Sequence, residues 1–367
     1  MKGITGFTKG TAALSRLPDT PPGEVWRYGG GGAFQVAPRK AAFFCTIWVG
    51  GKDNIDFVNG SDVILFDDLS DIRSDNAIPL SRSETGDSFV KVKGTVVGGF
   101  IPFGAKREDG SPHPHAGTGF GQNYARLLSL DQDGHYDYRK DTERWLESYQ
   151  FASNGKEFRV LEKERVELET LLPKWNLVGL GLTNAIPDAN DLLLGMTAKR
   201  DDAGVSGVAR WRRGADGWRP ISFVPVTGEE TGWGEPSLVR DVDGSLLFSA
   251  RNPDDPKLGI AFDVAVWRST DSGETWERII CRRKCRARSP ISINRAADGT
   301  PYIAANLPAV CRTREVLGLW PLNADRTDLE EPLIARDCRA EFGFAPSGSW
   351  WRVDHPRSAV LQLADGG

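Results

Sequence analysis

The stretch that most constrains the fold runs from Trp267 to Trp276 and reads WRSTDSGETW. Its form, Ser-x-Asp-x-Gly-x-Thr-Trp, is typical of a turn between two β-strands. Asp271 can accept hydrogen bonds from the backbone of the loop, and Gly273 can adopt a positive φ. Trp276 can anchor the turn by packing against apolar neighbours. We therefore predict two strands that are joined here by a tight turn.

The segment just upstream, from Glu235 to Arg251, reads EPSLVRDVDGSLLFSAR. It predicts a strand, a turn at Asp243-Gly244 and an apolar strand that ends at Arg251. Together with the turn that follows, it makes one unit of an all-β repeat. Degraded copies of these turns recur at intervals of roughly 60 residues, which fits four-stranded units with insertions. One series of turns has its glycines at positions 86, 155, 217 and 273, and a second series, with glycines at 134, 244, 299 and 366, interleaves with it.

These recurring turns, with 12 Trp and 41 Gly, favour an all-β architecture. We predict a β-propeller of four-stranded antiparallel blades, six-bladed with a seven-bladed ring as the alternative. A single domain is expected over residues 1–367, with an irregular segment at 1–24 and a last blade that is closed by an N-terminal strand or incomplete. The predicted strands cover 42–49, 62–66, 88–92, 192–198, 208–212, 246–250, 264–268, 301–305 and 359–363. Residues 161–172 are interpreted as strand, and 141–149 have helical periodicity.

Charge and composition exclude several classes of function. A net charge of −4 gives no basic face for nucleic acid. The chain has no apolar run of 18 residues, so we expect no membrane span. The N-terminus lacks the apolar region of a signal peptide, which leaves either an intracellular protein or a chain that begins after cleavage. The five cysteines are interpreted as free thiols, with a Cys311–Cys338 pair as the alternative in an exported protein.

The turn at Ser269–Trp276 resembles the Asp-box of sialidases and related BNR-repeat propellers, where it has a structural role. The segment from Glu235 to Arg251 is similar to the sialidase segment in which a Glu opens one strand and an Arg closes the next. The resemblance implies that Glu235 is the activating base and that Arg251 binds the carboxylate of the substrate. A guanidinium can bind a carboxylate through two parallel hydrogen bonds, which suits that role. The chain departs from the family in having no Tyr after Tyr302.

A second resemblance involves His113-Pro-His115-Ala-Gly-Thr-Gly-Phe120 and His135. This pattern is similar to the propeller-type lyases that degrade ulvan, in which His and Tyr residues perform acid and base catalysis and an Arg neutralises the uronate. It implies catalytic roles for these three histidines and for a tyrosine, for which the nearby candidates are Tyr124, Tyr136 and Tyr138. The alternatives are that the histidines cap a polar loop, or that His113 and His115 bind a metal from one face of an extended segment.

Four further residues are candidates for substrate binding. Arg288 and Asn306 occupy predicted strand ends, and His355 and Arg357 lie near the C-terminus. For each of these, and for Glu235 and Arg251, the alternative is a structural ion pair or hydrogen bond.

The sequence therefore predicts an enzyme that acts on carbohydrate, a sialidase-like hydrolase that cleaves a glycosidic bond at a carboxylated or otherwise anionic sugar. One alternative is a lyase that acts on uronate-containing glycans, and another is a non-catalytic propeller that binds glycan or protein. We expect a glycan as the substrate, a monomer, no cofactor and no metal.

Overall fold

The structure is a computed structural model of the 367-residue chain. It describes residues 25–29, 33–37, 40–50, 58–66, 80–82, 95–99, 116–125, 143–153, 158–166, 175–200, 203–228, 230, 232–251, 262–286, 289–307 and 316–337.

These residues form five antiparallel sheets that follow one another along the chain. The first sheet contains β1 (Val25–Gly29), β2 (Ala33–Ala37), β3 (Lys40–Gly50), β4 (Val58–Phe66) and β5 (Leu80–Arg82). The second contains β6 (Thr95–Gly99), β7 (Ala116–Ala125), β8 (Glu143–Ser153) and β9 (Phe158–Val166). The third contains β10 (Asn176–Leu180), β11 (Ile186–Asp188), β12 (Asp191–Arg200), β13 (Ala203–Gly214) and β14 (Gly217–Pro225).

The fourth sheet contains β15 (Gly234–Arg240), β16 (Leu246–Arg251), β17 (Phe262–Ser269) and β18 (Glu277–Arg286). The fifth contains β19 (Ser292–Arg295), β20 (Pro301–Asn306), β21 (Val316–Pro321) and β22 (Leu333–Asp337). In the second, fourth and fifth sheets the strands pair in chain order. In the first and third sheets two short strands share one partner, because β1 and β2 both pair with β3, and β10 and β11 both pair with β12.

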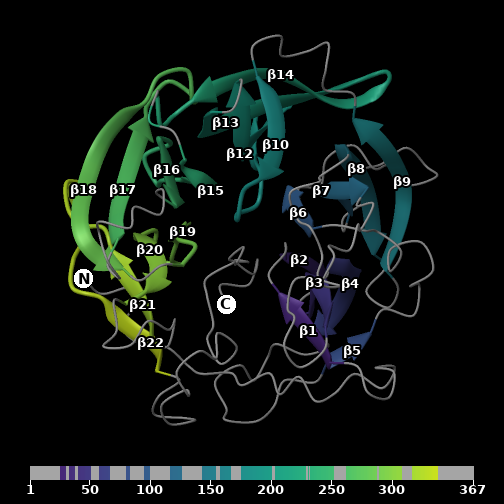
Figure 1. Cartoon of the computed structure of the whole chain (residues 1–367), viewed down its shortest axis with the longest axis horizontal. Coiled ribbons are helices and arrows are strands. Elements are labelled where there is room, and N and C mark those ends of the chain that lie inside the picture. Colours follow the sequence, from purple (N-terminus) through teal and green to yellow (C-terminus); the bar gives the residue numbers. More distant parts are fainter. Residues whose placement is uncertain are drawn as a thin grey trace, which may run out of the picture.

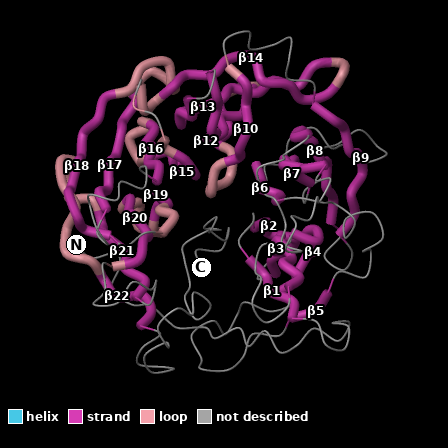
Figure 2. Tube along the Cα trace, viewed as in Figure 1, coloured by secondary structure: helices cyan, strands magenta, loops and turns pink. Residues whose placement is uncertain are grey.

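The sheets lie around a common centre, as Figure 1 shows. In the fourth and fifth sheets the first strand lies nearest the centre and the last strand lies on the outside (Figure 2). This is the all-β arrangement of curled antiparallel sheets that the sequence predicts. The predicted count of six blades stays a prediction, because the described residues form five sheets.

The apolar core lies between neighbouring sheets. Phe248 and Ala250 of β16 pack toward the third sheet, together with Ile186 and Leu193, whereas Leu247 packs toward the fifth sheet. Because successive side chains of a strand point to opposite faces, a strand that is covered on both faces is mainly apolar, and its buried polar groups are hydrogen-bonded. This explains the apolar residues of β16, in which the buried hydroxyl of Ser249 donates to the carbonyl of Ala265.

The fourth sheet has two ends that differ in their residues. Leu246 pairs with Ser269, so the predicted Asp-box turn lies at one end of the sheet. Gly234 pairs with Arg251 at the opposite end. We call these the Asp-box end and the Arg251 end.

The first strands of the third, fourth and fifth sheets run in the same direction. Thr183 and Asp188 of the third sheet contact Leu238 and Arg240 of the fourth, in that order. Farther around the ring, Ser237 accepts a hydrogen bond from the backbone N–H of Ile293, and Val242 packs beside Gly299. The ends of the third and fifth sheets that correspond to the Arg251 end of the fourth sheet therefore lie on the same side of the ring.

Most of the predicted strands that fall on described residues are confirmed. The helical periodicity of 141–149 does not produce a helix, because β8 occupies Glu143–Ser153 and pairs with both β7 and β9. Leu146 and Ser148 are both buried, so the burial follows the period of a strand. The strand predicted over 161–172 agrees with β9 as far as Val166. The predicted strands at 88–92 and 359–363 lie outside the described residues.

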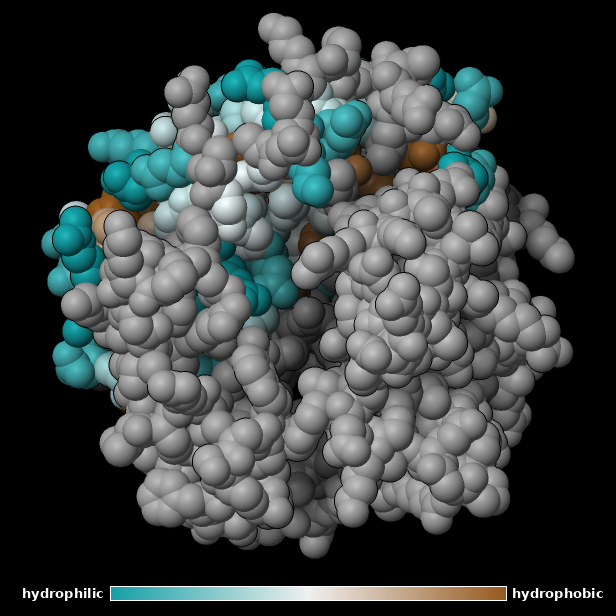
Figure 3. Space-filling model, in the orientation of Figure 1, coloured by the Kyte–Doolittle hydropathy of each residue, from teal (hydrophilic) through white to brown (hydrophobic). Residues whose placement is uncertain are grey.

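The described surface is mainly hydrophilic over the outer strands (Figure 3). The large hydrophobic residues that are exposed in it are Ile221, Val242 and Ile334. Within the described residues, no helix is long and apolar enough to cross a membrane.

Candidate functional site

The two residues that the sequence analysis placed at a catalytic site are in contact. Arg251 donates a hydrogen bond from Nη1 to Oε2 of Glu235 over 3.0 Å. Glu235 is the second residue of β15 and Arg251 is the last residue of β16, so both lie at the Arg251 end. Their side chains are 26% and 23% exposed, which leaves both partly open to solvent. The pair therefore joins a carboxylate and a guanidinium at a partly exposed sheet end.

Glu235 has an unusual backbone conformation. Its φ is +46°, in the left-handed region, which costs a residue other than glycine about 1–3 kcal/mol. Gly234 pairs with Arg251 and the next pair is Ser237 with Ser249, so β15 has one extra residue at this point. Such a β-bulge turns a side chain away from its regular direction. Here the bulge coincides with the residue whose carboxylate contacts Arg251.

The third sheet approaches the bulge closely. The backbone N–H of Leu182 donates to the carbonyl of Pro236 over 2.7 Å. A Cβ atom at Gly181 would lie 2.4 Å from the same carbonyl oxygen, so this approach requires a glycine. The conformation of Glu235 therefore depends on a neighbouring sheet as well as on its own.

The Asp-box turn has the hydrogen bonds that its sequence predicts. The carboxylate of Asp271 accepts hydrogen bonds from the N–H and the hydroxyl of Thr275 and from the hydroxyl of Ser269. These bonds, those from Thr275 first, lower the pKa of Asp271 to about 2. Gly273 has a φ of +90°, and Trp276 donates to its carbonyl and packs against Phe248. The predicted turn is confirmed.

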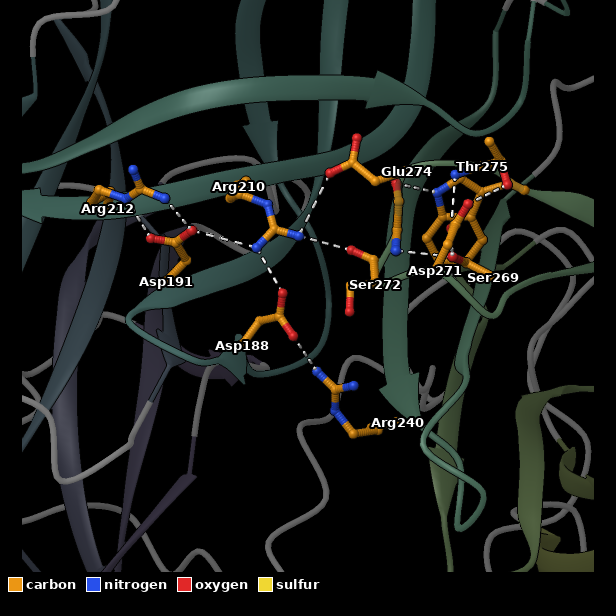
Figure 4. A network of polar contacts seen from close by, with 12 residues as sticks. Asp188, Asp191, Arg210, Arg212, Arg240, Ser269, Asp271, Ser272, Glu274 and Thr275 are labelled. Atoms are coloured by element: carbon orange, nitrogen blue, oxygen red, sulfur yellow. Dashed lines mark hydrogen bonds and ion pairs between the residues drawn. The ribbon is translucent and has the colours of Figure 1, made fainter.

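A network of ion pairs joins this turn to the third sheet (Figure 4). Arg210 of β13 donates to Asp188 over 2.6 Å and to the carbonyl of Ser272 in the Asp-box turn over 2.8 Å. Asp191 accepts two hydrogen bonds from Arg212, and the bond to this guanidinium lowers the pKa of Asp191 against the opposing effect of burial. The network holds two sheets together and faces away from the Arg251 end.

A second ion pair joins the Asp-box ends of the fourth and fifth sheets. Arg326, in the turn between β21 and β22, donates from Nε and Nη2 to the two carboxylate oxygens of Asp241 over 2.8 and 3.2 Å. The carboxylate of Asp241 is almost completely buried. Asp243 lies in the same turn as Asp241, between β15 and β16, and forms an ion pair with Arg268.

The other predicted site residues have different outcomes. Asn306 lies at the Arg251 end of β20, where it is buried and donates to the carbonyl of Val316. The role of Asn306 in substrate binding stays a prediction. The predicted residues that lie outside the described part of the chain are His113, His115, His135, Tyr138, Arg288, His355 and Arg357.

Tyr302, the last tyrosine of the sequence, lies at the end of its sheet that is opposite to Asn306. It pairs with Asn294 near the start of β20, toward the Asp-box end. Burial raises the pKa of Tyr302 to about 12, which disfavours the phenolate that a nucleophile needs.

The cysteines in β18 show no sign of a reactive site. Cys281 and Cys285 are free thiols, as predicted, and burial raises the pKa of Cys285 to about 11. In the part of the chain that the structure describes, no cluster of His, Cys, Asp or Glu could hold a metal ion.

Sequence reasoning missed the ion-pair network and the bulge. Arg210 and Arg212 are two residues apart on a strand and therefore share one face, which is a signal for a paired function. The bulge has a weaker signal in Gly234-Glu235-Pro236, where a glycine and a proline flank the acidic residue.

Comparison by sequence finds no matching protein-family model and no matching curated protein. Comparison of structures finds an α-L-arabinofuranosidase from Fusarium graminearum, with a TM-score of 0.52 and 11% identity over 84% of this chain and 82% of that one. A protein of unknown function from Dyadobacter fermentans has a TM-score of 0.51 and 12% identity over 86% and 87% of the two chains. The NanB sialidase from Streptococcus pneumoniae has a TM-score of 0.46 and 9% identity, and this chain spans 61% of its length.

The first two likenesses, at a low identity, concern the fold alone. The ring of curled antiparallel sheets is therefore a fold that the chain shares with these two structures.

Proposed function

We propose that this protein is a carbohydrate-active enzyme that hydrolyses a glycosidic bond at a carboxylated or otherwise anionic sugar. The observation that carries the proposal is the Glu235–Arg251 pair, held at a partly exposed sheet end with Glu235 in a left-handed conformation. Strained residues of this kind concentrate at functional sites. The fold that the chain shares with a structure of an α-L-arabinofuranosidase supports the class of reaction.

The proposed roles follow from the chemistry of the two groups. Arg251 can exchange its bond to Glu235 for a bidentate contact with the carboxylate of a sugar. Glu235, released from Arg251, can act as a general base and accept a proton from the water whose oxygen forms the new bond to the anomeric carbon. His113 or His115 would protonate the leaving oxygen as the glycosidic C–O bond breaks, because glycosidases need an acid and a base across that bond. The further proposed contributors are His135, Tyr138, Arg288, Asn306, His355 and Arg357.

The test is product analysis on a panel of sialosides, neutral glycans and uronate polysaccharides. New reducing ends and ultraviolet absorbance are measured together, since absorbance reports an unsaturated uronate. We expect reducing ends from an anionic glycan without absorbance. We expect a loss of at least about 100-fold in Arg251→Ala and in Glu235→Gln, from the loss of transition-state contacts. The matched control is Arg268→Ala, which removes an ion-paired arginine at the Asp-box end of the same sheet and should leave the rate near that of the wild type.

Each other outcome overturns a part of the proposal. Absorbance that is lost in Arg251→Ala and His115→Ala would make the protein a lyase. Binding of an anionic glycan without any cleavage would make it a non-catalytic binding propeller. Equal losses in Arg251→Ala and Arg268→Ala would assign a structural role to both arginines.

A further inference from the structure

The left-handed conformation of Glu235 must be stabilised by its surroundings, because the residue alone disfavours it. Pro236 fixes its own φ through its ring, so the adjustable part of the bulge is short. The conformation of Glu235 is therefore set by whatever holds the peptide groups on either side of Gly234 and Glu235.

On the C-terminal side the holding group is the backbone of the third sheet. The N–H of Leu182 donates to the carbonyl of Pro236 over 2.7 Å. This bond fixes the orientation of the peptide group that follows the bulge.

On the N-terminal side the holding group is the side chain of Ser206, in β13. Its hydroxyl donates to the carbonyl of Trp233 over 2.8 Å, and Ser206 is completely buried. Its backbone is occupied separately, because its carbonyl accepts hydrogen bonds from the N–H groups of Val226 and Thr227. The N–H of Gly232 donates to the carbonyl of Gly204 over 2.9 Å, which holds the same loop against the same strand.

We propose that Ser206 is a positioning residue of the candidate site: from the third sheet, it holds the peptide group of Trp233 and thereby keeps Glu235 in the left-handed conformation that presents its carboxylate to Arg251. This rests on the proposed function for its catalytic consequence, although the conformational effect can be measured without any substrate.

The first experiment compares the melting temperatures of Glu235→Gly and Glu235→Ala, which both lack the carboxylate. Glycine adopts a positive φ without strain and alanine does not, so the glycine variant should melt about 1–2 °C higher. In a Ser206→Ala background the bulge can relax, and the advantage of glycine should shrink. An advantage of the same size in both backgrounds would overturn the proposal. Ser206→Cys, which fills a similar space with a weak donor, serves as the background if Ser206→Ala does not fold.

The second experiment measures kcat and KM for the anionic glycan that the wild type cleaves. Ser206→Ala should lower kcat by about 10- to 100-fold with a smaller change in KM, which is the effect of a misplaced catalytic group. The control is Thr183→Ala, which removes a hydroxyl that joins the same two sheets but contacts Leu238, beyond the bulge. The control should lose stability and keep kcat near the wild-type value.

The two experiments separate the possible failures. Equal losses of kcat in Ser206→Ala and Thr183→Ala would show a general role in sheet packing and overturn the positioning role. If the wild type cleaves no glycan, the proposed function fails, and the comparison of the glycine and alanine variants alone decides whether Ser206 holds the conformation.

Discussion

At the Asp-box end of the fourth sheet the charged residues hold the molecule together, whereas at the Arg251 end a charged pair is presented to solvent. Arg326 binds a nearly buried Asp241, and Arg210 joins Asp188 to the carbonyl of Ser272. These bonds join neighbouring sheets, and the bond from Arg210 also occupies a backbone carbonyl of the Asp-box turn. At the Arg251 end, Glu235 and Arg251 belong to one sheet, are partly exposed and involve a strained backbone.

The two ends differ in whether their charged residues are available to a ligand. The Arg326–Asp241 pair links two sheets through a nearly buried carboxylate, and the loss of one partner of such a pair is strongly destabilising. A partly exposed pair can exchange partners with a ligand. Strain at Glu235 is tolerated because the neighbouring sheet holds the bulge on both sides. Three substitutions should break or sharpen this comparison.

The largest effect on stability is expected for Asp241→Ala. It leaves the guanidinium of Arg326 without the two carboxylate bonds and should lower the free energy of unfolding by about 3 kcal/mol. Chemical denaturation measures this loss, and the activity of the folded fraction should stay unchanged. The control is Asp298→Ala, because among the described residues the carboxylate of Asp298 accepts its hydrogen bonds from Thr300 in its own exposed turn. A similar loss of unfolding free energy in both variants would show that the Arg326–Asp241 ion pair stabilises the fold no more than the hydrogen bonds of an exposed turn.

A smaller effect, which reaches the Arg251 end, is expected for Gly181→Ala. The new Cβ would lie 2.4 Å from the carbonyl oxygen of Pro236, so the backbone must shift. Overpacking of this kind costs about 1–3 kcal/mol. Because Pro236 follows Glu235, glycan cleavage should fall together with stability. Gly204→Ala is the control, since its Cβ would meet nothing within 4 Å. If Gly181→Ala is less stable but keeps the wild-type kcat, the geometry of the bulge does not affect catalysis.

The smallest effect is expected for Asp271→Asn, and it depends on pH. Hydrogen bonds lower the pKa of Asp271 in the folded protein from its ordinary 3.8 to about 2. The folded state therefore binds this proton less readily than the unfolded state, and the carboxylate stabilises the fold above about pH 4. This contribution is lost as the pH falls toward 2.

Melting temperatures from pH 7 to pH 2 test the prediction. Asp271→Asn should melt below the wild type at pH 7, and the gap should narrow between pH 4 and pH 2. Asp216→Asn, in the corresponding exposed turn between β13 and β14, provides the comparison. A gap that does not change with pH would show that the charge of Asp271 does not stabilise the turn.

The sequence by itself determined the local parts of this protein. The pattern Ser-x-Asp-x-Gly-x-Thr-Trp contains its own hydrogen-bond donors and acceptors, so the turn at Ser269–Trp276 could be derived from neighbouring residues. The mainly apolar residues of 246–250 indicated a strand, which the structure confirms as β16. The resemblance to sialidases singled out Glu235 and Arg251 as candidate site residues, but it did not predict the hydrogen bond between them.

Only the tertiary structure decided the remaining features. The strand at Glu143–Ser153 replaced a helical periodicity because pairing with two neighbouring strands outweighs local pattern. The bond from Ser206 to Trp233 and the close approach of Gly181 to Pro236 join residues that are far apart in sequence and lie in different sheets. Such contacts have no local signature, because they depend on how one sheet packs against the next, and for that reason the conformation of Glu235 could be seen only in the folded chain.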